Sequence, residues 1–390
     1  MEYKTIKELC DLVVDCPHST PTWTEHGKIV IRNNNIKNGR IDFTSPSFTD
    51  DEHFAQRIKR AVPKAGDIVI TREAPMGEVG MIPEGIECCL GQRMVLLRAN
   101  ERICDKHYLL YGLQSQFVQH QISWSEGTGT TVSNLRIPHL EQIRVPYVPL
   151  DQQKKISSVL YALEDKIENN RKLNDNLFAQ MQALYAAWFI DCIPFGGIKP
   201  SSWQKTSIYT IADIIYGAPF SSKQFNTDGK GIPIIRIRDL KEQKVATYTT
   251  EKHPKGYLLQ AGDIVVGMDG EFVPYIWGSD EAWLNQRVCV FKNKRLKGKA
   301  FLYFTIKPLL YAIEQTQVAT TVIHIGKKDF DAFEITLPDP RVLDSFDAIT
   351  TPMVEKIVEN RFEIKQLELL RDALLPKLMS GELDVSNIQL

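Results

Sequence analysis

The sequence lacks the features that mark secreted, membrane-spanning and metal-binding proteins. Its seven cysteines are scattered and form no C-x-x-C pair, which favours reduced thiols in a cytosolic protein over a disulfide framework. The eight histidines form no H-x-x-x-H or H-x-E set, so a zinc site is not expected. No apolar run approaches about 20 residues, and the opening MEYKTIKELCDL does not have the layout of an export signal. We therefore expect a soluble, cytoplasmic protein with no metal site and no membrane partner.

The motifs of a DNA-modifying or nucleotide-using enzyme are also absent. The chain has no Pro-Pro pair, and hence no N-P-P-[FYW] loop of the kind that holds a flipped base. GTGTT from Gly127 belongs to neither a G-x-G-x-x-G sequence nor a P-loop, and the PD-(D/E)-x-K spacing of nucleases is missing. EDK at Glu164 falls on an expected helix, where it predicts a solvated charge cluster. We expect this chain to be non-catalytic and to hold no cofactor.

Length and charge limit the remaining classes. The 390 residues are enough for two or three domains of roughly 100 to 200 residues each. Hydrophobic residues make up 43% and charged residues 24%, which is typical of a folded globular protein. The 47 basic and 48 acidic residues give a net charge of -1, so any nucleic-acid binding must depend on local patches.

The two halves of the chain are diverged copies of each other. Four blocks of the first half recur in the same order in the second: AGDIV from Ala65 and Ala261, QR from Gln92 and Gln286, TTV from Thr130 and Thr320, and KI from Lys166 and Lys356. The displacement falls from 196 to 194 and then to 190 residues, as insertions in loops would produce. Self-similarity at a fixed period indicates a duplicated architecture.

Each copy has a strand-rich part followed by a helical part. Short β-rich runs such as DIVIT and RMVLL are bounded by Gly, Pro and Asn, whereas the later segments lose Gly and Pro for most of their length. The predicted fold class is α+β, with two pseudo-symmetric globular domains separated by an antiparallel two-helix coiled coil. The expected boundaries are a first globular domain at 1–150, a first helix at 151–190, a second globular domain at 191–340 with a linker at 191–200, and a second helix with the C-terminal tail at 341–390.

Both helical parts carry an apolar seam with alternating steps of four and three residues, which is typical of a coiled coil. Asn170 and Asn360 occupy the same repeat position, where a buried Asn fixes register at some cost in stability. The alternative is that each amphipathic helix packs on its own domain. We favour pairing, which would hold the domains about 45 Å apart over 30 residues. The residues expected to pair the helices are Leu163, Ile167, Asn170, Leu177, Leu184, Ile357, Asn360, Ile364, Leu367 and Leu374.

Basic and polar residues gather in segments that could bind DNA. The segment 28–72 has nine basic and five acidic residues, and 287–307 has seven basic and none acidic. Arg and Asn match the edges of guanine and adenine, whereas Lys, Ser and Thr mostly contact phosphates. Polar turns, solvated lysine-rich loops and helix caps are the structural alternatives. The candidate DNA-binding residues are Arg32, Asn33, Asn34, Lys37, Arg72, Thr130, Thr131, Ser133, Asn134, Arg236, Arg238, Lys241, Arg287, Lys292, Lys294, Thr320, Thr321, His324, Lys327 and Lys328.

The repeated pair Gln92-Arg93 and Gln286-Arg287 lies inside strand-like runs. For these residues a role in stabilising the fold is expected at least as much as contact with DNA.

Taken together, these blocks resemble the specificity subunit of a type I restriction-modification system over nearly the whole chain. The resemblance is carried by the AGDIV block of each half, by TTVSNLRIPHLEQIRVPYVPLDQQKKI and by LLPKLMSGELDV. VPLDQQKKI is close to the family's P-L-P-E-Q-x-x-I entry into the first helix, whereas the second copy has LPDPRVLDSFDAI at this place.

The resemblance implies that each recognition domain reads one half of a split DNA sequence in the major groove. It also implies that the paired helices set the length of DNA between the two halves. It also implies three partners: double-stranded DNA, two methyltransferase subunits that carry S-adenosylmethionine, and the restriction subunits that act as translocase and nuclease. The chain itself would hold no cofactor and catalyse nothing. The alternatives are a single-chain DNA-modifying enzyme with an unrecognised site and a helical scaffold that does not bind DNA.

Overall fold

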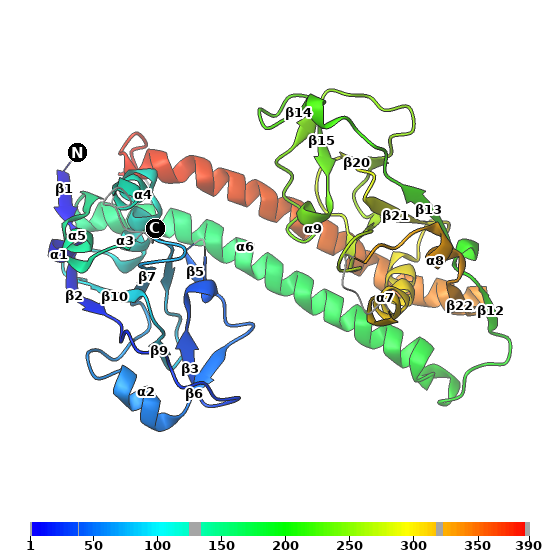
Figure 1. Ribbon diagram of the computed structural model, residues 1–390, viewed down its shortest axis with the longest axis horizontal. Coiled ribbons are helices and arrows are strands. Elements are labelled where there is room, and N and C mark those ends of the chain that lie inside the picture. The colour runs from blue at the N-terminus through cyan, green and yellow to red at the C-terminus, as the bar shows by residue number, and fades with distance from the viewer. Residues whose placement is uncertain (1, 38, 125–133, 317–322, 387–390) are drawn as a thin grey trace. The chain divides into compact units, whose positions relative to one another are not determined.

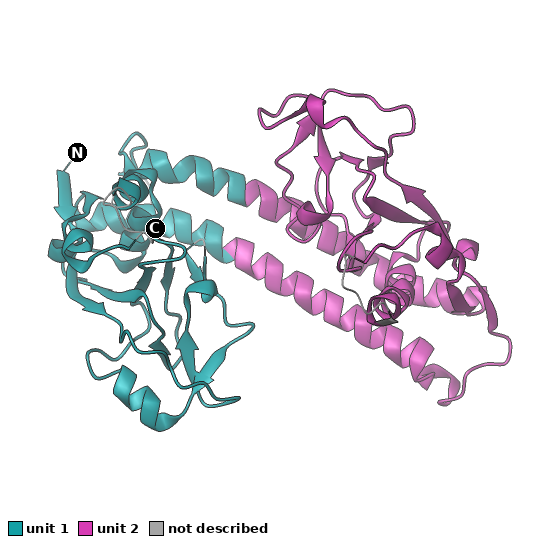
Figure 2. Ribbon diagram, in the orientation of Figure 1, with its two compact units in different colours: residues 1–165, 368–390 teal, residues 166–367 magenta. Residues whose placement is uncertain are grey.

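The computed structural model describes residues 2–37, 39–124, 134–316 and 323–386, and the chain divides into two compact units (Figures 1 and 2). Unit 1 comprises residues 1–165 and 368–390, and unit 2 comprises residues 166–367. Each unit contains a strand-rich domain and one segment from each of two long helices, α6 (Leu150–Tyr185) and α9 (Pro340–Met379). The predicted α+β class, with two strand-rich domains and paired long helices, is confirmed.

Two sheets form the centre of unit 1. A four-stranded antiparallel sheet has the order β2 (Cys10–Asp15), β10 (Met94–Ala99), β7 (Ile68–Thr71) and β8 (Val79–Met81). A three-stranded sheet has the order β6 (Ser47–Thr49), β3 (Lys28–Ile31) and β9 (Cys88–Leu90), and its β3–β9 pair is parallel. Two further pairs join β1 (Glu2–Thr5) to β11 (Arg144–Tyr147) and β4 (Ile36–Lys37) to β5 (Arg40–Ile41).

The burial of β10 on both faces explains why its first four residues, MVLL, are all apolar. Met94 and Leu96 pack against the three-stranded sheet, and Val95 and Leu97 pack on the opposite face against helices. A strand buried on both faces needs no polar alternation. The short helices of this unit are α1 (Ile6–Leu9), η1 (Asn33–Asn35), α2 (Asp51–Arg57), α3 (Lys106–Gln114), α4 (Gln116–Ser123) and α5 (Ile137–Gln142).

The strand-rich domain of unit 2 repeats this topology. Its four-stranded antiparallel sheet has the order β13 (Ala212–Tyr216), β21 (Val288–Asn293), β18 (Ile264–Gly267) and β19 (Pro274–Ile276). The five-stranded sheet has the order β14 (Phe225–Asn226), β16 (Tyr248–Thr249), β15 (Ile232–Ile235), β20 (Ala282–Leu284) and β17 (Leu258–Leu259), and its β15–β20 pair is parallel. The pair β12 (Gln204–Ser207) and β22 (Glu334–Leu337) corresponds to β1 and β11. The duplicated sequence therefore folds into a duplicated topology.

The helices of unit 2 connect these strands. They are η3 (Ala186–Ile190), η4 (Ile193–Phe195), η5 (Ile208–Thr210), η6 (Ser222–Gln224), η7 (Ile237–Asp239), α7 (Lys299–Thr316) and α8 (Lys327–Asp331). Within the described residues, none of the helices combines the length and the apolar character needed to cross a membrane.

The long helices begin at equivalent places in the two copies. α6 has neither Gly nor Pro and ends at Tyr185, where η3 continues the helical stretch to Ile190. Two residues later Cys192 adopts a left-handed conformation with φ of 52°. α9 begins at Pro340, which is 190 residues after Leu150. Only Pro338 and Asp339 separate β22 from α9, so the unusual LPDP sequence still leads directly into the helix.

In unit 1 the two helix segments pair and also pack on the domain. Ile156 and Leu160 of α6 share a core with Leu378 and Met379 of α9 and with tyrosines of α3. The carboxylate of Glu164 accepts hydrogen bonds from two arginines, one on the β4–β5 hairpin and one on α9: Arg40 Nη2 at 2.7 Å and Arg371 Nη1 at 2.8 Å. The side chain of Glu164 is only 13% exposed, so the prediction of a solvated charge cluster at Glu164 is wrong. This carboxylate instead ties both arginines to α6.

In unit 2 the helix segments run antiparallel. The amide of Asn360 donates to Oδ1 of Asn174 at 2.8 Å, and the amide of Asn170 donates to Glu363 at 2.8 Å. Met181 of α6 joins the domain core together with residues of α9 such as Ile357. The two alternatives considered for the helices therefore hold at once, because the helices pair with each other and each also packs on a strand-rich domain.

The residues predicted to pair the helices all lie on α6 or α9. Four of them are buried: Ile167, Asn170, Ile357 and Asn360. The others are half-buried: Leu163, Leu177, Leu184, Ile364, Leu367 and Leu374.

Candidate nucleic-acid interface

Three segments of unit 1 meet around Glu73. Glu73 follows β7, Arg93 precedes β10, and Asn134 precedes α5. Two backbone hydrogen bonds hold these segments together: the N–H of Arg72 donates to the carbonyl of Arg93 at 2.8 Å, and the N–H of Leu135 donates to the carbonyl of Arg72 at 3.0 Å. We call Glu73, Arg93 and Asn134 the first triad.

The carboxylate of Glu73 organises the first triad. Its Oε2 lies 3.2 Å from Nε of Arg93, and its Oε1 accepts a hydrogen bond from the amide of Asn134 at 2.7 Å. The Arg93 side chain is 55% exposed, whereas that of Glu73 is 19% exposed. Arg93 also has a left-handed backbone with φ of 65°, which costs a non-glycine residue about 1 kcal/mol or more. The fold thus holds an exposed arginine in a disfavoured conformation, a feature that clusters at functional sites.

Unit 2 contains the equivalent arrangement. Asp269 follows β18, Arg287 precedes β21, and His324 precedes α8. The N–H of Met268 donates to the carbonyl of Arg287 at 2.9 Å, and the N–H of Ile325 donates to the carbonyl of Met268 at 3.0 Å. These two bonds repeat those of unit 1 residue for residue. We call Asp269, Arg287 and His324 the second triad.

The second triad also centres on a carboxylate. Nη1 of Arg287 lies 3.5 Å from Oδ1 of Asp269, and Nδ1 of His324 lies 2.6 Å from the same oxygen. The Arg287 side chain is 55% exposed, like that of Arg93, and that of Asp269 is 26% exposed. Both copies therefore present an exposed guanidinium beside a carboxylate, accompanied by a third polar side chain that differs between them.

Arg72, a predicted DNA-binding residue, is buried. Its Nε donates to the carbonyl of Leu135 at 2.9 Å, its Nη1 to the carboxylate of Asp15 at 2.8 Å, and its Nη2 to Oδ1 of Asn134 at 3.1 Å. These bonds occupy its guanidinium within the domain. Arg72 therefore positions Asn134 and lies beneath the surface that the first triad exposes.

Arg32 and Arg236 cap equivalent turns, η1 and η7. In both turns the backbone N–H of the arginine donates to the side chain of the third residue of the turn, at 2.9 and 3.0 Å. The guanidinium carbon of Arg32 lies 5.2 Å from the ring centre of Trp23, and that of Arg236 lies 5.9 Å from the ring centre of Phe225. An aromatic face restricts the position of a cation without neutralising it. In unit 2 a carboxylate is also present, because Oδ2 of Asp239 lies 3.8 Å from Nε of Arg236. The two copies thus repeat a second arginine site.

The turn η1 is attached to the first triad. The amide of Asn33 donates to the backbone carbonyl of Glu73 at 2.6 Å. Several other predicted residues are exposed on or beside η1, η7 and α8: Asn34, Lys37, Arg238, Lys241, Lys327 and Lys328. Five predicted residues lie outside the described residues: Thr130, Thr131, Ser133, Thr320 and Thr321.

The positive charge of the basic run 287–307 is partly offset by acidic side chains from other segments. Acidic side chains from other segments pair with its members: Lys292 with Asp263 at 2.8 Å, Lys294 with Asp213 at 3.1 Å, and Arg295 with Asp347 at 2.9 Å. Burial opposes the charge on Lys292, but hydrogen bonds with Asp263 and Tyr257 outweigh burial and raise the pKa of the lysine. Acidic partners distant in sequence therefore offset part of the positive charge of this run, and contact of Lys292 and Lys294 with DNA stays a prediction.

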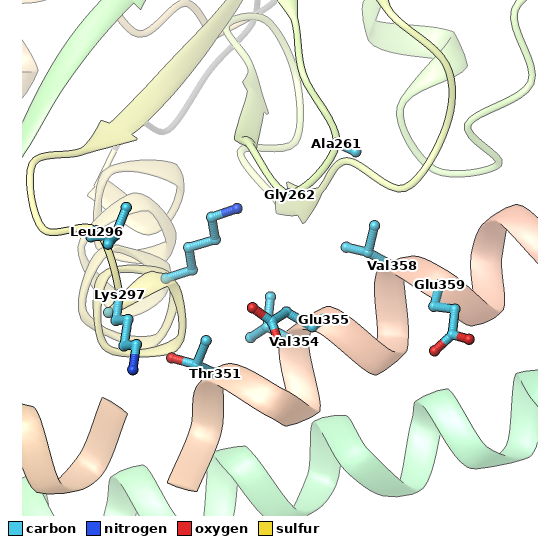
Figure 3. A pocket seen from close by; sticks show the side chains of 11 residues that line it. Ala261, Gly262, Leu296, Lys297, Thr351, Val354, Glu355, Val358 and Glu359 are labelled. Atoms are coloured by element: carbon cyan, nitrogen blue, oxygen red, sulfur yellow. The ribbon is translucent and has the colours of Figure 1, made fainter. Parts of the chain in front are cut away.

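Unit 2 also contains a cavity of about 300 Å³ between the loop that precedes α7 and one face of α9 (Figure 3). Leu296 and Lys297 line it from the loop, and residues such as Val354 and Glu355 line it from the helix. Burial lowers the pKa of Lys299, which also lines the cavity. Across the described parts of the chain, no group of three or more His, Cys, Asp or Glu side chains is placed to hold a metal ion.

A duplicated strand-rich domain with an exposed arginine beside a carboxylate in each copy, joined to paired helices, defines a class of proteins with two strand-rich domains in tandem. A model of the family described as "Type I restriction modification DNA specificity domain" matches residues 1–178 and 200–357, and the chain belongs to this family.

Two curated relatives and one solved structure illustrate the relationship. The MjaIX specificity subunit of Methanocaldococcus jannaschii is 25% identical over 354 residues, which cover 84% of this chain and 80% of the relative. The EcoBI specificity subunit of Escherichia coli is 37% identical over 138 residues, which cover 35% of this chain and 29% of the relative. The crystal structure of the S subunit of a type I restriction-modification system from M. genitalium matches with a TM-score of 0.59 at 17% identity, over 97% of this chain and 95% of that one. This structural likeness supports the fold.

Sequence reasoning missed three members of the triads. Arg93, Glu73 and Asp269 were not among the predicted site residues, although Arg287, Asn134 and His324 were. The signal was present in the repeat, because Gln-Arg recurs at Gln92 and Gln286 before a strand in both copies. Placing the pairs inside strand-like runs favoured a stabilising role. In the structure both arginines stand just outside the strands, where their side chains are exposed.

Proposed function

We propose that this chain is the non-catalytic subunit that gives a type I restriction-modification complex its DNA sequence specificity. Each strand-rich domain reads one half of a bipartite DNA sequence. The observation that carries the proposal is the repetition of one geometry with different chemistry: the triads share their backbone hydrogen bonds and their exposed arginine, but one has Glu and Asn and the other Asp and His. Two domains of the same shape with different side chains are suited to two different half-sequences, and hence to an asymmetric target.

The proposed division of the chain follows the two copies. Residues 1–150 and 191–340 are the target-recognition domains, with 191–200 as a linker, and 151–190 and 341–390 supply the helices and the C-terminal tail. The helices pair antiparallel and set the spacer between the half-sequences. A stretch of 30 paired residues corresponds to about 45 Å.

The proposed partners are double-stranded DNA, two methyltransferase subunits and the restriction subunits. The methyltransferase subunits supply S-adenosylmethionine and the chemistry, and they dock on the helices and the recognition domains. The net charge of -1 favours assembly before DNA binding, because the chain alone offers no general positive field to attract phosphates.

Methylation by the reconstituted complex tests the function. Co-expression of this chain with the methyltransferase subunits of its own system, followed by single-molecule sequencing of the host DNA, should reveal one bipartite, asymmetric motif with a modified adenine in each half. The affinity of the purified complex for DNA should fall steeply as salt rises.

The control is the chain alone with labelled S-adenosylmethionine and DNA, for which no methyl transfer is expected. Methyl transfer by the chain alone would identify a single-chain enzyme. A complex that binds no DNA at any salt concentration would identify a scaffold.

A further inference from the structure

We propose that Arg93 and Arg287 are equivalent specificity-determining residues, each of which reads a guanine in its own half of the target. Glu73 with Asn134, and Asp269 with His324, are the positioning residues that fix the two guanidinium groups. This inference rests on the proposed function and adds to it the residues and the base class.

The carboxylates of Glu73 and Asp269 favour a base over a phosphate as the ligand of the neighbouring arginine. Glu73 lies 3.2 Å from Nε of Arg93, and Asp269 lies 3.5 Å from Nη1 of Arg287. A carboxylate this close lowers the local positive potential and repels a phosphate, which carries a full negative charge. The O6 and N7 acceptors of a guanine edge carry only partial negative charge, so the same carboxylate opposes this ligand far less while it orients the arginine. The geometry therefore favours base reading.

The chemistry of the guanidinium selects guanine. Arginine has five N–H donors in a planar fork, so an ion pair through one nitrogen still permits a bidentate contact through others. Guanine presents two acceptors, O6 and N7, side by side in the major groove, and their bidentate contact with arginine is the commonest base-specific contact. The side chains of Arg93 and Arg287 are both 55% exposed, as such a contact requires.

The position of each arginine is fixed by the fold. The carbonyl of Arg93 accepts from the N–H of Arg72 at 2.8 Å, and the carbonyl of Arg287 accepts from the N–H of Met268 at 2.9 Å. Each arginine therefore stands at a defined distance from the strand that carries its carboxylate. A specific contact with a base requires that the backbone of the contacting residue is held in a fixed position. A flexible lysine on a loop would instead suit a phosphate.

The test compares single substitutions within the reconstituted methyltransferase complex. Arg93→Gln should relax one guanine position in one half-sequence only, and Arg287→Gln should do the same in the other half. Loss of a bidentate contact corresponds to a fall of roughly 10- to 100-fold in the preference for guanine at that position. Arg93→Lys should weaken the preference while keeping the charge, because lysine lacks the planar fork of arginine. The matched controls are Arg102→Gln and Arg341→Gln, two exposed arginines outside the triads, which should leave the motif unchanged.

Three outcomes would overturn the inference. One is an unchanged motif for both arginine variants that assemble with the methyltransferase. Another is a weaker affinity for all sequences alike with a shallower salt dependence, which identifies a phosphate contact. The third is a change that spreads over both half-sequences. If the unaltered complex modifies no bipartite motif, the proposed function itself fails, and this result is distinct from all three.

Discussion

At the scale of single residues, buried arginines organise the surface of unit 1. The guanidinium of Arg57 donates to the backbone carbonyls of Leu90 at 2.8 Å, Gly91 at 2.9 Å, Ser19 at 3.1 Å and Pro17 at 3.2 Å. Burial lowers the pKa of Arg57. One side chain thus fixes the loop that follows β2 and the segment that leads to the first triad, where loop carbonyls would otherwise lack donors.

Two equivalent positions beside the triads hold different residues in the two copies. In unit 1 Arg72 pairs with Asp15. In unit 2 the same positions of the repeat and of the strand register hold Met268 and Tyr216, which pack on the domain core. In place of this ion pair, unit 2 therefore has a methionine and a tyrosine that pack on the domain core, and the backbone hydrogen bonds around the triad are unchanged.

This difference predicts a compensating pair of substitutions. Arg72→Met alone should lower the free energy of unfolding by about 2 to 3 kcal/mol, because it leaves the carboxylate of Asp15 and the carbonyl of Leu135 without their charged donor. Arg72→Met together with Asp15→Tyr should recover at least half of the loss, since the pair then matches unit 2. Chemical denaturation of Arg72→Met, of Asp15→Tyr and of the double variant measures this. A double variant whose loss equals the sum of the single losses would contradict it.

At the scale of elements, antiparallel pairing decides which polar residues meet between α6 and α9. Asn170 and Asn360 share a repeat position in sequence, but Asn360 lies opposite Asn174, and Asn170 lies opposite Glu363. The hydrogen bond from Asn170, followed by that from Lys166, lowers the pKa of Glu363. Each polar layer thus contains a different pair of residues, and a shift in the register of the two helices would separate the members of each pair.

The Asn174–Asn360 layer gives a prediction for a double-mutant cycle. Asn174→Leu should lower stability by about 1 to 3 kcal/mol, because the buried amide of Asn360 loses its acceptor. For a unit of this size the thermal midpoint should fall by roughly 3 °C per kcal/mol. Changing both residues to Leu should restore the midpoint, since an apolar layer fits the seam.

The control for this cycle is Gln182→Leu, at an exposed position of α6, which should leave the midpoint nearly unchanged. A double variant that stays as unstable as Asn174→Leu alone would show that the amides do not act as a pair.

At the scale of the whole molecule, the two long helices make the proposed spacer testable. Helix pairing is present in both units, through Leu160 and Leu378 in one and through Asn174 and Asn360 in the other. Since an α-helix rises about 1.5 Å per residue, seven residues correspond to about 10 Å, or three base pairs of B-DNA. A change in the length of the paired helices can therefore be compared directly with a change in the number of base pairs between the two half-sequences.

A matched insertion of one heptad into both helices should lengthen the gap of the target. We expect heptads placed after Asn174 in α6 and before Asn360 in α9, which leaves the Asn174–Asn360 layer intact, to add about three base pairs to the spacer while leaving both half-sequences unchanged. Sequencing of modified DNA from cells with the altered complex measures the gap. Seven residues inserted between Gly196 and Gly197, outside the paired helices, form the control and should change nothing. An unchanged gap in the helix variant would disprove the spacer role.

The sequence alone determined the features that depend on local pattern. The duplication, the α+β class and the long helices follow from repeated blocks and from the spacing of apolar residues, which act over a few turns or a few strand positions. The start of α9 at Pro340 follows the same displacement of 190 residues that relates the two helices in sequence. Several exposed candidates, such as Arg32 and Arg287, were also predicted from residue type alone.

Only the tertiary structure decided which distant side chains meet. The local sequence around Glu164 predicts a solvated side chain, but Arg40 and Arg371 donate hydrogen bonds to it. In unit 2, acids from other segments pair with part of the basic run, such as Lys292 and Lys294. Arg93 became a candidate because strand register places it beside Glu73 and repeats the arrangement in unit 2. Such contacts depend on strand register and turn conformation over tens of residues. The local sequence pattern carries no information about which charged side chains from distant segments will lie next to a given residue.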